Sequence, residues 1–324
     1  DSAEHRREGG TGMNKLNRVL LGAGAFLVMS GGLLALTGWA TGADTEAMRE
    51  VSFFGSSGRR TDTSIESATD LGMGQGFQEG IDLEPFSKLD VDIDLGDIYI
   101  QTGESYDVVL DWSGDHYQLT YELEGDTLKV RSSGGVNSNL AKHQATVYVY
   151  LPQDAALTEL KAHAALGNLE VSDVTVQKAE LSGDLGDING YGLTAGELTV
   201  QCSLGGIFLA DASADTAEIT NNMGDIEVVE CDTASALTVR ADLGSVDLQG
   251  DFRGEVDVTS NMGGITLNLA EPESAYSYDL EVDMGELYIN GASSRRSASG
   301  SGSPHTLTAE ADMGDINLWF DEVD

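Results

Sequence analysis

The sequence is short of basic residues: 17 Lys and Arg stand against 55 Asp and Glu in 324 residues, a formal net charge of −38. A surface this acidic repels phosphate backbones and anionic lipid headgroups, and it attracts cations. A nucleic-acid partner is therefore excluded. Cysteine is nearly absent as well, since Cys202 and Cys231 are the only two. No dense disulfide framework can support the fold.

Catalytic motifs are also missing. The chain has no GxSxG, no HExxH and no phosphate-binding glycine loop, and its five histidines share no motif spacing. Polysaccharide lyases and hydrolases need an acid and a base gathered in one groove. The carboxylates of this chain follow a repeat instead, so the sequence predicts a protein without enzymatic activity and without a catalytic cofactor. A polysaccharide-active β-helix enzyme is the alternative.

Proline and aromatic residues are scarce, with 4 prolines and 6% Phe, Trp and Tyr, whereas there are 40 glycines. This composition indicates many turns and a core of small aliphatic side chains. The glycines are also periodic, because the phrase DLGDI at residues 94–98 returns in eight variants. The central glycines lie 71, 19, 19, 19, 20, 19, 22 and 29 residues apart. A period near nineteen indicates stacked structural repeats.

One repeat can be followed outward from its central glycine, which we number zero. Apolar residues recur at −7, −5, −3 and −1, and then at +2 and +4; around Gly205 they are Leu198, Val200, Cys202, Leu204, Ile207 and Leu209. Alternation with period two predicts strands. The parity changes between −1 and +2, so we expect both of these residues to point inward. The glycine is then a corner between a strand of about seven residues and one of about four.

A lone repeat cannot bury its inner face, whereas stacking at about 4.8 Å pairs every strand with the repeats above and below. The sequence therefore predicts an all-β fold, a parallel β-solenoid with rungs of about 19 residues. It should resemble a right-handed β-helix, because parallel crossovers are nearly always right-handed. An antiparallel meander is the alternative, and it explains the constant period less well. The predicted corner glycines are Gly96, Gly167, Gly186, Gly205, Gly224, Gly244, Gly263, Gly285 and Gly314.

The two cysteines fall within this repeat. Cys202 is at −3 and Cys231 is at +7 of the next rung, and both positions are apolar in other copies. We therefore expect two buried thiols that behave as small apolar residues. A disulfide across the interior is the alternative.

The longest apolar run is uncharged and covers 22 residues, from Val19 to Ala40. At about 1.5 Å per residue it reaches about 33 Å, enough to cross a hydrocarbon core of about 30 Å. Lys15 and Arg18 precede it and acidic residues follow it. We therefore expect residues 1–18 in the cytoplasm, a transmembrane helix over 19–40 and the rest outside, in a single-pass protein of the cell membrane. A cleaved signal peptide is the alternative, although its apolar region is usually shorter.

Composition also divides the exported part. Residues 41–80 are polar and glycine-rich, which predicts a flexible linker before an extracytoplasmic domain over 81–324. The 71-residue interval contains strand-like segments, which predict cap strands inserted over 101–160. The Gly/Ser stretch at 291–305 predicts a mobile loop outside the core.

Aromatic residues concentrate in the predicted cap. They either face a protein or glycan partner or cover the end of the solenoid, and the sequence leaves both open. These residues are Tyr106, Trp112, Tyr117, Tyr121, Tyr148 and Tyr150.

The stretches FSKLDVDIDLGDIYIQTG (86–103) and ATVYVYLPQDAALTELKAHAALGNLEVSDV (145–174), followed by the LGDI-type rungs, resemble a known family. It is the bacterial adhesin-like family of β-strand-repeat domains, also called toast-rack domains, which includes LiaG-like membrane proteins. The resemblance covers roughly residues 86–320. It implies an extracytoplasmic β-solenoid linked with envelope stress or surface adhesion, and it supplies no catalytic residues.

Acidic residues recur at −2 and +1, on the outer side of each predicted corner. Stacking would align their oxygens along one edge, and Ca²⁺, which takes about six to eight oxygens, would relieve the repulsion between them. The alternative is a solvated acidic edge that discourages aggregation. The candidate metal ligands are Asp94, Asp97, Asp184, Asp187, Asp225, Asp283, Glu286, Asp312 and Asp315.

These patterns predict a membrane-anchored extracytoplasmic repeat protein with a non-enzymatic binding, envelope-sensing or structural role. The alternative is a surface adhesin that binds a glycan or an envelope polymer, with or without Ca²⁺. A groove with one base and two acids would favour an enzyme. Aromatic residues exposed on one sheet would favour glycan binding.

Overall fold

Alternating apolar and polar residues form strands throughout the described part of the chain, which comprises residues 75–113, 117–134 and 144–321 of the computed structural model. Apart from one 3₁₀ turn (Glu273–Ala275), the regular elements in these ranges are all strands, which confirms the all-β prediction. No helix among them is long and apolar enough to cross a membrane. The predicted cytoplasmic segment, the membrane helix over 19–40 and the linker up to residue 74 lie outside the described residues.

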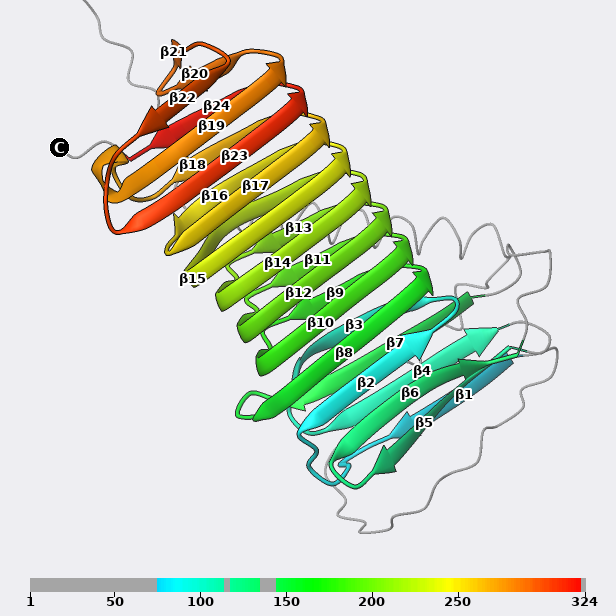
Figure 1. The fold of residues 1–324 in the computed structure, drawn as a ribbon. Coiled ribbons are helices and arrows are strands. Elements are labelled where there is room, and N and C mark those ends of the chain that lie inside the picture. Colours follow the sequence, from blue (N-terminus) through cyan, green and yellow to red (C-terminus); the bar gives the residue numbers. More distant parts are fainter. Residues whose placement is uncertain (1–74, 114–116, 135–143, 322–324) are drawn as a thin grey trace, which may run out of the picture. The chain divides into compact units, whose positions relative to one another are not determined.

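The 24 strands form one hydrogen-bonded sheet, because β15 (Ile226–Leu243) runs from one side of the fold to the other. The pairings divide this sheet into two layers, each ordered along the stack (Figure 1). The long-strand sheet contains β5 (Gln118–Glu124), β6 (Thr127–Ser133), β2 (Lys88–Ile93), β8 (Leu157–Leu166), β10 (Thr175–Leu185), β12 (Thr194–Leu204), β14 (Ser213–Met223), the second half of β15, β17 (Glu255–Met262), β23 (His305–Met313), β19 (Tyr276–Met284) and β22 (Ser297–Gly300). The short-strand sheet contains β1 (Gln75–Gly80), β4 (Asp107–Ser113), β7 (Gln144–Pro152), β3 (Asp97–Gly103), β9 (Leu169–Ser172), β11 (Ile188–Tyr191), β13 (Ile207–Ala210), the first half of β15, β16 (Val246–Phe252), β18 (Ile265–Leu269), β24 (Ile316–Phe320), β20 (Leu287–Ile289) and β21 (Ala292–Ser293).

Each rung joins one long strand to one short strand at a corner glycine, and neighbouring rungs are parallel and in register. Leu185 at the end of β10 pairs with Leu166 of β8 on one side and with Leu204 of β12 on the other. Residues 19 apart are therefore direct neighbours across these rungs. This pairing confirms the parallel solenoid and excludes an antiparallel meander for the repeated rungs.

The corner glycines are required by two features of the backbone. Their φ angles lie between 124° and 158°, a region that side chains with a Cβ rarely adopt. In addition, a Cβ on Gly186 would lie 2.0 Å from the carbonyl oxygen of Gly167, and a Cβ on Gly205 would lie 2.0 Å from that of Gly186. The backbone also continues its ladder here, since the Gly186 N–H donates to the Leu204 carbonyl at 3.0 Å. No other residue fits such a corner.

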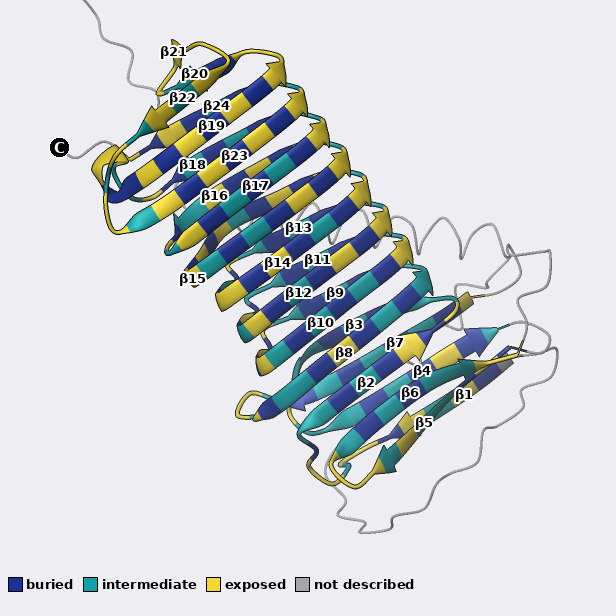
Figure 2. Cartoon of the chain, viewed as in Figure 1, coloured by how far each residue is buried: buried dark blue, intermediate teal, exposed yellow. Residues whose placement is uncertain are grey.

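The core lies between the two sheets, and the predicted inward positions are confirmed except at −1. Leu198, Val200 and Ile207 are almost fully buried, and burial alternates along the strands (Figure 2). The inward prediction for −1 was wrong in seven of the nine rungs, where Leu204, for example, is 43% exposed, whereas Leu95 is partly buried and packs against the core. The bend already begins at Leu204, so its side chain lies on the convex side, towards solvent.

The N-terminal end extends both sheets. Strands β6 and β7 pair in parallel with β2 and β3, while β5 and β4 add to them antiparallel. Strand β1 pairs antiparallel with β4. The linker prediction was therefore wrong for residues 75–80, because they complete the short-strand sheet.

The C-terminal end does not follow the order of the sequence. The last rung, β23 and β24, lies between β17–β18 and β19–β20. The mobile-loop prediction for 291–305 was wrong where β21 and β22 form, since β22 pairs antiparallel with β19. Small residues are needed there, because a Cβ on Gly300 would lie 2.1 Å from the Tyr278 ring. The Gly/Ser segment thus covers an edge that would otherwise be free to pair.

We predict that Gly186→Ala lowers the free energy of unfolding by about 3 kcal/mol or more, through the clash with the Gly167 carbonyl and the strained φ. Gly183→Ala in β10, just before this corner, is the control, because its nearest contact would be an ordinary 3.5 Å to the Ile188 side chain. It should change stability by less than about 1 kcal/mol. Denaturant unfolding measures both, and equal losses would contradict the corner argument.

Candidate functional site

The acidic residues predicted as a calcium ladder do lie on the corner edge, and most are exposed. Four of the five acids at +1 accept a backbone hydrogen bond from the next rung. Asp97 Oδ1 accepts from the Asn168 N–H at 2.8 Å, and Asp187 Oδ1 accepts from the Gly206 N–H at 2.7 Å. Asp225 and Asp315 do the same for Ser245 and Glu286. These carboxylates therefore satisfy corner N–H groups that the sheet leaves without an acceptor.

The charge of Asp225 fits this role. Hydrogen bonds from the Ser245 N–H and hydroxyl, both at 2.8 Å, lower the pKa of its carboxyl. A carboxylate held in this way stays ionised because both donors stabilise the charged form.

The ladder is broken along its length. Asn168, Gly206, Ser245 and Gly264 occupy +1 in four of the nine rungs. Acids therefore meet directly only in the last two rungs, as Asp315 beside Glu286 at +1 and Asp312 beside Asp283 at −2. Within the described residues, no group of three or more His, Cys, Asp and Glu side chains is arranged to hold a metal ion. Calcium binding stays a prediction.

The structure also brings together a histidine, a serine and an aspartate, which bears on the enzyme alternative. His163 Nδ1 lies 3.0 Å from Ser182 Oγ, and His163 Nε2 lies 3.9 Å from Asp184 Oδ2. All three are on the outer face of the long-strand sheet. The backbone around Ser182 is engaged in parallel pairing with β8 and β12, so it offers no oxyanion hole. The arrangement lacks the geometry for acyl transfer.

Cys202 and Cys231 are buried and unbonded to each other, as the repeat predicted. Burial raises the pKa of Cys231 to about 11, so its thiol is neutral and unreactive.

Tyrosines group on the outer face of the short-strand sheet. Tyr99 of β3 and Tyr148 of β7 have ring centroids 5.0 Å apart with planes 15° from parallel, and Tyr150 follows at 6.3 Å and 10°. Further along the same face, Tyr191 and Phe208 lie 5.7 Å apart. All five rings are partly exposed. We call these five residues the tyrosine cluster.

A carboxylate lies within this cluster. Glu170 of β9 is the register neighbour of Tyr99, and its charge acts on Tyr99, Tyr148 and Tyr191. Burial among these residues raises the pKa of Glu170. Burial, followed by the charges of Asp97 and other neighbours, raises the pKa of Tyr99 to about 12. The site therefore combines aromatic surface, neutral phenol hydroxyls and a partly desolvated acceptor.

The sequence identified only part of this cluster. Tyr148 and Tyr150 are in it, whereas Trp112 and Tyr117 are buried and Tyr106 packs against Phe86. Tyr121 packs against the core. The sequence missed Tyr99, Tyr191 and Phe208. The repeat pattern nevertheless indicates that these three residues face outward. Each lies at +3 or +5, next to the inward-facing positions +2 and +4 of a short strand.

A second surface runs along the corner edge. The −1 residues stack as an apolar ridge from rung to rung, with Met223 beside Leu243, Leu243 beside Met262 and Met262 beside Met313. We call it the Leu/Met stripe; it consists of Leu95, Leu166, Leu185, Leu204, Met223, Leu243, Met262, Met313 and Met284. The sequence placed these side chains in the core. The sequence did set this position apart from the other apolar positions, because every methionine within residues 75–321 occupies it.

These features define a class of protein: a two-layered solenoid of parallel β-rungs that carries the tyrosine cluster and the Leu/Met stripe on its outer surfaces. The Toastrack DUF4097 family matches residues 86–321, and the chain belongs to that family, which confirms the resemblance seen in the sequence. No curated protein matches the chain.

Solved structures are similar to the chain at low identity. A candidate adhesin from Bacteroides fragilis is 16% identical, with 75% of this chain and 95% of that one covered and a TM-score of 0.45. A candidate cell adhesion protein from Clostridium sporogenes is 15% identical, with 76% and 100% covered and a TM-score of 0.31. A candidate lipid-binding protein from Parabacteroides distasonis is 13% identical, with 78% and 98% covered and a TM-score of 0.42. Similarity at this level carries no statement about function.

We predict that Asp187→Ala lowers stability by about 1 kcal/mol, because the Gly206 N–H loses its acceptor. Asp187→Asn keeps that oxygen and should change stability little. Asp184→Ala at the same corner is the matched control, since Asp184 caps no backbone group. Thermal unfolding compares the three variants, and equal losses for Asp187→Ala and Asp184→Ala would contradict the capping role.

Calcium binding is tested by calorimetric titration of Ca²⁺ into the protein. If the acidic ladder binds the ion, the heat of binding should saturate and the melting temperature of the protein should rise. Asp184→Asn with Asp187→Asn should weaken both effects. If the heat of titration is no larger than that of a control at the same ionic strength, calcium binding is contradicted and the acids keep only their hydrogen-bonding role.

Proposed function

We propose that this chain is a non-enzymatic binding protein that recognises a neutral glycan or envelope polymer through the tyrosine cluster. The observation that supports the proposal is the grouping of Tyr99, Tyr148 and Tyr150 on the outside of one sheet, with Glu170 among their neighbours. Partly exposed aromatic side chains that gather on one face of a sheet are typical of a surface that a partner covers.

The chemistry of the cluster suits a polyhydroxylated ligand. Tyrosine offers apolar ring area with little loss of side-chain entropy on binding, and its hydroxyl both donates and accepts. The charges of Glu170, Asp97 and Asp111 act on these phenols, so their carboxylates are near enough to accept hydrogen bonds from the hydroxyls of a bound ligand. The net charge of −38 disfavours phosphate- or sulfate-rich polymers, which agrees with a neutral ligand.

The same proposal places the domain outside the cell. Residues 19–40 would anchor it in the membrane, with the N-terminus in the cytoplasm. Envelope glycans lie in that compartment. A sensing or structural role in the envelope is compatible with the same binding surface.

We predict that Tyr99→Ala and Tyr148→Ala each weaken binding to neutral glycans on an array by about tenfold, through loss of one stacked ring. Tyr288→Ala is the matched control, because Tyr288 is a surface tyrosine of β20 at the other end of the same sheet. Binding that all three variants lose equally, or that anionic glycans show instead, would contradict the proposal.

The environment of Tyr99 predicts a pH dependence. Its pKa is raised from 10.0 to about 12 in the folded protein, so the phenol ionises more readily in the unfolded chain. Its contribution to stability is full below about pH 10 and is lost as the pH rises through about 12. We expect Tyr99→Phe to lessen the loss of unfolding free energy over this range. Denaturant unfolding at several alkaline pH values checks this, and an identical fall in both proteins would contradict it.

A further inference from the structure

We propose that the Leu/Met stripe is a docking surface for a cationic amphipathic segment of a partner protein. The stripe is a separate surface from the tyrosine cluster, and it is exposed over most of its length. Among its members, Leu185 is 49% exposed, Met262 is 42% exposed and Met284 is 60% exposed. Single exposed apolar residues are normal, whereas a continuous row marks an interaction site.

The stripe is long enough for a specific partner. It crosses nine corners, and eight intervals of about 4.8 Å give about 38 Å. A helix of about 25 residues covers that length at about 1.5 Å per residue. The methionines suit such a partner, because their unbranched, polarizable side chains adapt to different apolar surfaces.

Charge specifies the kind of segment. The −2 and +1 residues on either side of the stripe include ten acids and no Lys or Arg: Asp94, Asp97, Asp184, Asp187, Asp225, Asp242, Asp283, Glu286, Asp312 and Asp315. A segment with an apolar strip flanked by Lys and Arg complements this pattern.

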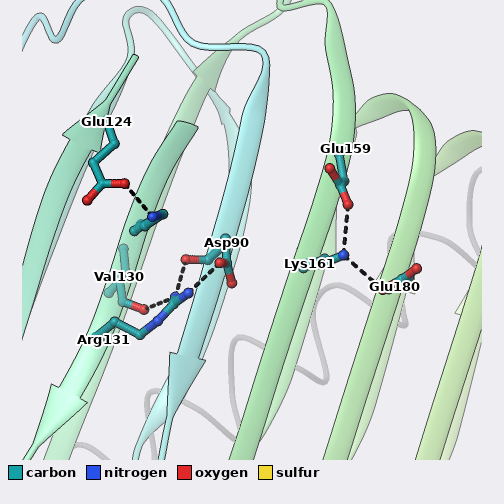
Figure 3. Close-up of polar contacts among 8 residues, drawn as sticks. Asp90, Glu124, Val130, Arg131, Glu159, Lys161 and Glu180 are labelled. Atoms are coloured by element: carbon teal, nitrogen blue, oxygen red, sulfur yellow. Dashed lines mark hydrogen bonds and ion pairs between the residues drawn. The ribbon is translucent and has the colours of Figure 1, made fainter. Parts of the chain in front are cut away.

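The chain does not neutralise these acids itself. Within the described residues, Lys and Arg pair with acids away from the corner edge (Figure 3). Arg131 pairs with Asp90, and Lys161 lies 2.8 Å from Glu159 and 3.6 Å from Glu180. The corner acids form no ion pair with Lys or Arg there; the one contact to a basic side chain is His163 with Asp184 at 3.9 Å. Their charge is available to a partner.

The same charges disfavour the other occupants. A second copy would bring two acidic edges together, and an anionic membrane would repel the acids on both sides of the apolar row. A cationic protein segment removes both conflicts.

The test measures binding of a fluorescent leucine–lysine peptide of about 14 residues, with leucine at helical spacing, to the purified full chain by anisotropy. Met223→Ser with Leu243→Ser and Met262→Ser should weaken binding at least about tenfold, because three adjacent apolar contacts are lost. Asp225→Asn with Asp242→Asn should weaken it too and reduce its salt dependence. Both asparagines keep the oxygens that accept from Ser245 and Asn261.

The control variant is Phe77→Ser with Ile81→Ser and Trp319→Ser, which removes three exposed apolar side chains outside the stripe. It should bind the peptide like the unaltered protein, and circular dichroism should show that all variants fold. Unchanged binding by the stripe variant, or equal binding of a leucine–glutamate peptide, would overturn the proposal. So would binding of phosphatidylcholine vesicles in place of the peptide, or a dimer that the stripe variant abolishes.

Discussion

The structure depends on one close contact, in which the carbonyl oxygen of a corner glycine lies against the Cα of the corner glycine in the next rung. The geometry leaves 2.0 Å for a Cβ at Gly186 and Gly205, so none can be present. This approach lets the corners stack at the spacing of the strands. Both sheets can then keep their parallel hydrogen bonds on either side of the bend. A wider corner would pull the two sheets out of register with each other.

The tight corner also decides what the surface offers. In most rungs residues −2 to +1 lie outside the core where the chain turns, so polar and apolar side chains alike face solvent there. Acids at +1 accept a hydrogen bond from a backbone N–H of the next rung, as Asp187 does from Gly206. The apolar side chains at −1 cannot make such a hydrogen bond. The repeated phrase therefore builds the fold with its glycine, its +1 acceptor and its +2 core residue, and it exposes a Leu/Met row as a consequence.

The sequence predicted much of the fold but a smaller part of the candidate sites. Alternation and glycine spacing predicted the rungs around Gly205 and the outward acids, because these features are local to one repeat. The tyrosine cluster joins residues from four strands, and Tyr99 meets Tyr148 only because β7 returns beside β3 after the inserted strands. The exchange of the last two rungs was likewise hidden, since β19 and β23 have the same apolar pattern and either could follow β17.

The sequence by itself determined the all-β class, the length of a rung, the residues facing the core at −7, −5, −3, +2 and +4, and the place of each corner. It could do so because period two and the need for glycine act within a few neighbouring residues. Only the tertiary structure decided that −1 faces solvent, that β22 covers β19, and which tyrosines meet. These outcomes depend on the curvature of the bend and on pairings between distant segments, where several registers satisfy the local pattern equally and packing selects one.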